Sequence, residues 1–177
     1  MTNTFRHSQT AGFLFTAVLG TFLHFLFDLS GGSPLAALVS AVNESIWEHM
    51  KLLYYPMAVF AVYQYRAWGK DAEDFWWVKF LGLIFGLGLI PAVYYTYTGI
   101  LGINVDWFNI AIFFLAAGTA FYLEHRLFEG KRTSRVPSGW GVLGILLIGT
   151  VFVGLTFFPP EIPFFRDPLT GTYGFQK

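Results

Sequence analysis

Cysteine is absent from the 177 residues of this chain. Disulfides, thiolate zinc sites, iron–sulfur clusters and cysteine nucleophiles are therefore excluded. Charged residues are also scarce, since Asp, Glu, Lys and Arg together make up only 12% of the sequence. Basic and acidic side chains number 11 each, so no surplus of positive charge predicts a nucleic-acid partner.

Apolar sequence is abundant instead, with 55% hydrophobic and 20% aromatic residues. A soluble domain of this size carries more charge on its surface, and the apolar residues here form runs long enough to cross a bilayer as helices. These runs lie at about residues 11–29, 43–65, 76–97, 107–123 and 140–158. The sequence therefore predicts an all-α integral membrane protein, a single membrane domain over residues 1–177. We expect a bundle of five transmembrane helices with the lipid bilayer around it.

The segments outside these runs differ in charge, which predicts the orientation. The N-terminal segment and two connections carry the basic residues Arg6, Arg66, Lys70, Arg126, Lys131, Arg132 and Arg135. The two other connections, residues 30–42 and 98–106, contain no Lys or Arg. Basic segments mark the cytoplasmic side of a membrane protein. We therefore expect a multi-pass protein of the plasma or inner membrane with a cytoplasmic N-terminus and an irregular tail, residues 159–177, outside.

The second apolar run opens with an unusually polar stretch, "NESIWEHMK", residues 43–51. Its polar members include Asn43, Glu44, Glu48, His49 and Lys51. In a helix, Glu44, Glu48 and Lys51 share one face, because they are spaced i, i+4 and i+7. Ionisable side chains inside a membrane are costly and usually face a bundle interior or a water-filled cavity. Ser45 and Glu48 also form the S-x-x-E pattern that is typical of a helix start.

The first apolar run has a matching polar stripe. Every fourth residue from 12 to 28 is small or polar: Gly12, Thr16, Gly20, His24 and Asp28. A stripe of this kind faces other helices rather than lipid. Because the two runs are joined by one short connection, we expect His24 and Asp28 to meet the polar stretch at the outer end of the bundle.

Other polar residues are predicted to lie at the same outer end. Asp106 and Asn109 stand at the outer start of the fourth run. In the tail, residues 167–171 suit a tight turn that includes Asp167. We expect the tail to cover the pocket as a lid, with Arg166 facing the acidic residues. Glu124 and His125, beside the basic connection, are expected to be ordinary interfacial residues.

Histidine and carboxylate ligands in one pocket favour a divalent metal ion, Zn²⁺ or another. The expected ligands are His24, Asp28, Glu48 and His49. The catalytic groups would be the carboxylates of Glu44 and Glu48, with Glu44 as general base on a metal-bound water. The protein would then be a metal-dependent membrane hydrolase acting on lipid or peptide at the outer face.

Three other interpretations stay open at this point. The cluster is a structural ion network in the first of them, with Lys51 pairing to Glu44 or Glu48 inside one helix. In the second, the protein is a subunit for ion or proton transport or for sensing. In the third, His24 and His49 hold a haem. A homo-oligomer is a further expectation, for which the small-residue pairs 82/86 and 116/120 offer helix-packing surfaces.

Two stretches of the chain resemble the signatures of a known family. The first is "LHFLFDLSGGSP…SAVNESIWEHMKL", within residues 23–52, which contains NES-x-WEH-x-K. The second is "FFPPEIPFFRDPLTGTYG", residues 157–174, which contains PP-x-x-P-x-F-R/K-DP-x-TG-x-YG. The family is one of small bacterial multi-spanning membrane proteins, known as a domain of unknown function. The resemblance implies that these residues match family positions: His24, Asn43, Glu44, Trp47, Glu48, His49, Lys51, Arg166, Asp167, Pro168, Gly171 and Gly174. It implies no activity, substrate or cofactor.

Overall fold

The structure is a computed structural model that describes residues 3–130 and 136–176. Of the basic residues behind the predicted orientation, Lys131, Arg132 and Arg135 lie outside the described residues, as does the side chain of Arg6. The described part forms the helices α1 (Asn3–Leu29), α2 (Pro34–Ala37), α3 (Ile46–Ala67), α4 (Phe75–Leu101), α5 (Asp106–Glu129) and α6 (Ser138–Phe157). Two short 3-10 turns complete it, η1 (Gly69–Asp71) and η2 (Pro163–Phe165).

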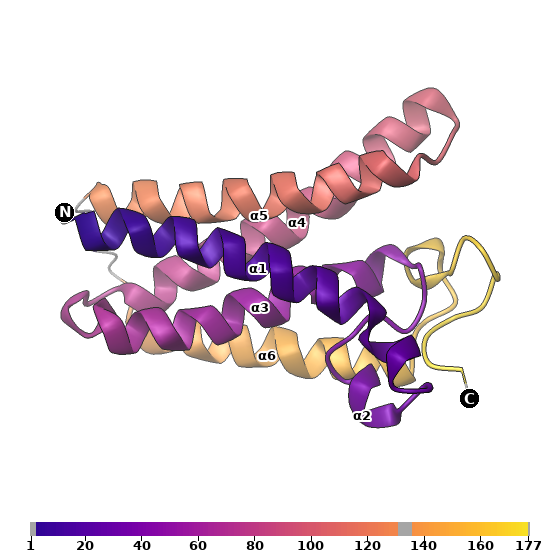
Figure 1. Cartoon of the computed structure of the whole chain (residues 1–177), viewed down its shortest axis with the longest axis horizontal. Helices are drawn as coiled ribbons and strands as arrows, with labels where there is room; N and C mark the ends of the chain where they lie inside the picture. Colours follow the sequence, from indigo (N-terminus) through magenta and orange to yellow (C-terminus); the bar gives the residue numbers. More distant parts are fainter. Residues whose placement is uncertain (1–2, 131–135, 177) are drawn as a thin grey trace.

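The long helices run along the long axis of the molecule in alternating directions, so the two termini lie at opposite ends (Figure 1). Helix α1 packs on α3 and α5, while α4 packs on α3, α5 and α6. The main hydrophobic core is built around α3, where Leu53, Tyr54 and Met57 are all nearly fully buried. The expectation that the first two long helices are neighbours is therefore met.

Four of the helices are long and apolar enough to cross a membrane by length and composition, namely α4, α5, α6 and α1 from His7 onward. This finding suggests a membrane protein. Helix α3 has 22 residues but carries Glu48, Lys51 and Arg66, which lower its hydropathy. The side chains of Glu48 and Lys51 are almost completely buried, so the remaining helices enclose the polar part of α3.

The start of α3 differs from the sequence prediction in a way that matters for the site. The helix begins at Ile46, with Ser45 as its N-cap, and not near Asn43. The Ser45 hydroxyl accepts a bond from the backbone N–H of Glu48 at 3.3 Å. The Asn43 side-chain oxygen accepts one from the N–H of Ser45 at 2.9 Å, so residues 43–45 form a turn before the helix. Glu44 is consequently not part of any helical face.

The small-residue pairs of α4 and α5 pack against each other inside the chain. Ala116 and Ala120 are fully buried. A Cβ atom on Gly86 would lie 3.1 Å from the Cβ of Ala120, and one on Gly82 would lie 2.4 Å from the Cγ of Glu124. These surfaces are thus occupied by the monomer's own helices, and an oligomer remains a prediction that needs another surface.

Gly141 permits a close approach between α6 and the backbone of α4. Replacing it with a larger residue tests this packing. A Cβ atom at this position would lie 2.2 Å from the backbone oxygen of Trp76. Because backbone cannot move aside as a side chain can, we expect Gly141→Ala to lower the free energy of unfolding by about 1–3 kcal/mol. The thermal unfolding midpoint in detergent micelles measures this loss. Gly139→Ala is the matched control, since nothing lies within 4 Å of a Cβ there; equal midpoints for the two variants would contradict the prediction.

The tail after α6 folds back on the ends of α3 and α6. The Trp47 ring of α3 packs against Phe152 of α6 and against Phe164 and Phe165 of the tail. Gly174 has a positive φ of 57°, and a Cβ there would lie 2.5 Å from the backbone oxygen of Thr156. Only glycine suits this position, where the tail touches the end of α6.

Candidate functional site

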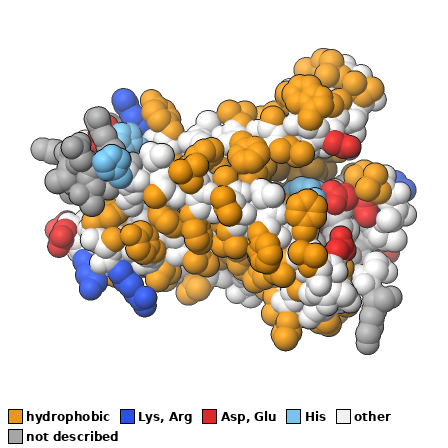
Figure 2. All heavy atoms as spheres, viewed as in Figure 1, with side chains coloured by type: hydrophobic (Ala, Val, Ile, Leu, Met, Phe, Trp, Pro, Cys, Tyr) orange, Lys and Arg blue, Asp and Glu red, His pale blue; other side chains and the backbone are white. Residues whose placement is uncertain are grey.

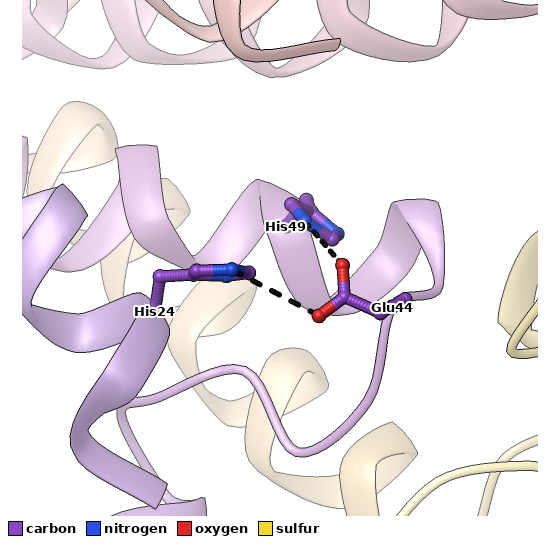
Figure 3. Close-up of side chains that lie close together, drawn as sticks. All are labelled: His24, Glu44 and His49. Atoms are coloured by element: carbon purple, nitrogen blue, oxygen red, sulfur yellow. Dashed lines mark ion pairs between the residues drawn. The ribbon is translucent and has the colours of Figure 1, made fainter. Parts of the chain in front are cut away.

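The structure brings His24, Glu44 and His49 together at the end of the bundle near the tail (Figure 3). They come from α1, from the turn before α3 and from the first turns of α3, respectively. The Glu44 carboxylate points one oxygen at each ring: Oε1 lies 3.8 Å from His24 Nε2, and Oε2 lies 3.3 Å from His49 Nε2. Their side chains are 29–42% exposed, so the cluster is accessible from outside the protein.

Local hydrogen bonding fixes the orientation of His49. Its Nδ1–H donates to the backbone oxygen of Ser45 at 2.9 Å, which directs Nε2 toward Glu44. The hydrogen bond from His49 is the main reason why the pKa of the Glu44 carboxyl lies below its ordinary value. A neutral ring would place the lone pair of Nε2 against this carboxylate. Either a proton or a metal ion between the two atoms removes that repulsion.

The three side chains fit a small metal ion. One ligand atom from each lies within 4.8 Å of the others. Ligands bound at about 2.0–2.1 Å to a tetrahedral ion are about 3.4 Å apart, so shifts of an ångström or less would close this site. Two imidazoles and one carboxylate suit Zn²⁺, and the same set also holds Fe²⁺ in other proteins. Three protein ligands leave a coordination position open.

Two of the predicted ligands lie outside this group. Glu48 is 1% exposed, and its carboxylate accepts bonds from Lys51 Nζ at 2.6 Å and from the Thr156 hydroxyl at 2.9 Å. Lys51 also donates to Thr156 and to the backbone oxygen of Ala37. The carboxylate of Glu48 is therefore used in a buried ion pair. Asp28, one turn beyond His24 on α1, is exposed.

The other predicted pocket residues have separate surroundings. Asn43 donates to the backbone oxygen of Gly174 at 3.2 Å. Asp106 is exposed at the start of α5, and Asn109 bonds to Tyr97 and Asn104 at the α4–α5 connection. This connection projects away from the rest of the bundle (Figure 1). Asp106 and Asn109 are therefore not brought to the His24 cluster, whereas Asn43 adjoins Glu44 in the chain.

The predicted lid is only partly recognisable in the tail. Asp167 is buried and accepts bonds from the N–H of Leu169 and the hydroxyl of Thr170, as the expected tight turn requires. Arg166 is exposed, and among the described residues it forms no ion pair with Glu44 or Glu48. The tail meets the site through Asn43, next to Glu44, rather than through a charge contact.

Comparison with known proteins places the chain by sequence. A model described as "Family of unknown function (DUF6512)" matches residues 5–175. The chain belongs to this family. The match includes every residue of the His24 cluster and both resemblance stretches, and it supplies no activity. No curated protein and no solved structure matches the chain.

The region matched by the family also contains a buried polar cluster that sequence reasoning missed. Lys79 of α4 forms an ion pair with Glu124 of α5 and donates to Gln64 of α3 at 2.7 Å. Glu124 is fully buried, so the prediction of an ordinary interfacial residue is wrong for it. Its partner is 45 positions away in the sequence. The available signal was Lys79, a lone charge within an otherwise apolar run.

Proposed function

We propose that this protein is a metal-dependent hydrolase of the membrane, with its metal held by His24, Glu44 and His49 near the outer face. The observation that supports the proposal is the convergence of two imidazoles on the two oxygens of one carboxylate. A structural salt bridge needs only one such ring. The second ring, supplied by another helix, gives the set expected of a catalytic metal site.

The proposed topology has five spans, with α3 as the second, a cytoplasmic N-terminus and the tail outside. Alternating helix directions and termini at opposite ends support an odd number of crossings (Figure 1). Lys and Arg side chains gather mainly at the end that carries the N-terminus (Figure 2). The positive-inside rule supports a cytoplasmic position for this end and, with it, a position near the outer surface for the His24 cluster.

The chemistry follows from the arrangement of the ligands. A metal ion in a site with three protein ligands leaves room for water and lowers the pKa of that water toward neutrality, which suits hydrolysis of an ester, amide or phosphoester. His49 is held in the binding tautomer by the carbonyl of Ser45. Glu44 contacts both rings, so we assign it as the third ligand instead of a general base. A haem between the two rings would have to displace this carboxylate.

A different role is proposed for Glu48 and Lys51. Their buried pair joins α3 to Thr156 of α6 and to the segment before α3, through Ala37 and the backbone N–H of Val42. Every one of these contacts is inside the protein, and neither side chain is exposed beyond 1%. These contacts support the structural interpretation for this half of the polar stretch, and Glu48 is not proposed as a catalytic group.

Elemental analysis of the purified protein tests the metal site. We expect about one equivalent of zinc or another divalent transition metal per chain. The His49→Ala and His24→Ala variants should retain less than about a tenth of it. In proteoliposomes, hydrolysis of reporter esters, amides or phosphoesters should stop after chelation and resume when the metal is restored.

His125→Ala is the matched control, because His125 also lies 3.3 Å from a carboxylate oxygen, that of Glu129, but belongs to no group of metal-ligating side chains among the described residues. Its metal content should equal that of the unchanged protein. A folded protein that takes up no zinc, iron or manganese during reconstitution would exclude the metal site. Metal bound without any turnover would leave a binding site and exclude the hydrolase.

A further inference from the structure

A second site lies on the other half of the molecule, in a groove between α1 and α5. Its volume is about 470 Å³, within the range of small-molecule sites, which is about 300–1,000 Å³. The residues lining it are Gln9, Thr10, Phe13, Gly118, Phe121, Tyr122 and His125. Helices α1 and α5 run antiparallel here, as the contacts of Phe5 with His125 and of Gly12 with Phe121 show.

Polarity changes along the groove. The end nearer the N-terminus is polar, because Gln9 and Thr10 of α1 and His125 of α5 line that end of the antiparallel pair. One to two turns deeper the lining becomes apolar, with Phe13, Phe121 and Gly118. The groove therefore offers one polar and one apolar end, as an amphiphilic ligand requires.

Gln9 supplies the polar group of the groove that lacks a partner. The residue is only 6% exposed, yet neither its amide nitrogen nor its amide oxygen has a hydrogen-bond partner among the described residues. A buried amide without partners is costly. A ligand acceptor that binds the Gln9 amide nitrogen, or a ligand donor that binds the amide oxygen, would remove part of this cost.

A basic residue, Arg126, lies next to the polar end of the groove. Arg126 is exposed and lies one helical turn beyond Tyr122, so both stand on the same face of α5. A guanidinium in this position suits a phosphate. In a phospholipid bound with its phosphate at Arg126, an ester carbonyl would lie at the level of Gln9 and an acyl chain would lie along Phe13 and Gly118.

We propose that the α1–α5 groove binds a glycerophospholipid from the leaflet at the N-terminal end of the bundle. The phosphate lies at Arg126, an ester carbonyl accepts from the Gln9 amide, and one acyl chain fills the apolar end. We favour a membrane lipid as the occupant because the groove lies between two helices that are apolar enough to span a bilayer. Lipid would therefore surround its opening. The proposal is independent of the metal site.

The test uses the full chain in nanodiscs that contain a phosphatidylglycerol with a photoactivatable diazirine midway along one acyl chain. After illumination, peptide mass spectrometry should find the label concentrated on residues 9–13 and 118–122. Gly118→Leu should reduce this labelling severalfold, because the new side chain fills the apolar end, where a Cβ has only Phe13 as a neighbour at 3.8 Å. Gln9→Leu should reduce lipid retention about three- to tenfold, as expected for the loss of one or two hydrogen bonds in a membrane.

The matched control is Gly88→Leu, which adds the same side chain to α4 where nothing lies within 4 Å of a Cβ. It should leave labelling of the groove unchanged, and so should His49→Ala. Label spread evenly over the lipid-facing surfaces of all helices would overturn the proposal. Groove labelling in Gly118→Leu and lipid retention in Gln9→Leu that both equal those of the unchanged protein would also overturn it. Protein–protein cross-links at the groove would overturn it in favour of a second copy of the chain.

Discussion

Replacing Lys51 with Met is expected to lower the free energy of unfolding by about 3–5 kcal/mol. The ammonium group of Lys51 is fully buried and has three partners, the carboxylate of Glu48, the hydroxyl of Thr156 and the backbone oxygen of Ala37. Methionine has a similar length but no charge, so the variant leaves the Glu48 carboxylate buried without a counter-ion. Titration with SDS in mixed micelles measures the loss.

A double variant separates the ion pair from simple packing. Glu48→Leu combined with Lys51→Met removes both charges, so the loss of unfolding free energy in the double variant should be well below the sum of the losses in the two single variants. The control is Lys70→Met, which removes an exposed lysine and should leave the stability nearly unchanged. A Lys51→Met protein as stable as the Lys70→Met protein would refute the structural role of the pair.

Neutralising Glu124 should have an effect of similar size at the opposite end of the bundle. Glu124→Gln removes the carboxylate that balances the charge of Lys79, which is 2% exposed, and leaves neutral amide oxygens as its acceptors among the described side chains. We expect a loss of about 3–5 kcal/mol in unfolding free energy, measured in the same micelle titration. The cluster connects three helices, because Lys79 of α4 bonds to both Glu124 of α5 and Gln64 of α3.

Glu129→Gln is the control on the same helix. Glu129 is exposed and pairs with His125, and exposed pairs of this kind contribute little. Combining Glu124→Gln with Lys79→Met should recover part of the loss, because no unpaired charge then remains buried. If Glu124→Gln and Glu129→Gln prove equally mild, the cluster does not hold the helices together.

The helical regions of the fold were predictable because each apolar run is long, uniform and bounded by turn residues. The exact start of α3 was harder to predict. The i, i+4 spacing placed Glu44 and Glu48 on one helical face, but α3 begins at Ile46. Glu44 therefore turns toward α1 from a non-helical position, while Glu48 faces α6. The start of the helix was indicated by Ser45 and its capping pattern, and it decides which acid joins the imidazoles.

The meeting of His24 with the polar stretch was predictable from depth, since both lie near the same end of neighbouring helices. The Lys79–Glu124 pair was not, because nothing in local sequence aligns α4 with α5 at that level. Its register depends on packing, in which Gly82 leaves the space that the Glu124 side chain occupies. Such a fit between a glycine and a distant carboxylate becomes visible only once the helices are assembled.

The hydrogen bond between Asn43 and Gly174 has a consequence for biosynthesis. The two residues are 131 positions apart, and Asn43 directly precedes Glu44. A ribosome adds about 5–20 residues per second, so this interval corresponds to roughly 10 s. During that time the turn that carries Glu44 lacks this anchor. An ion that reached the proposed metal site on the nascent chain would thus bind before the fold is complete, and a chaperone or slow delivery of the ion would favour the correct order.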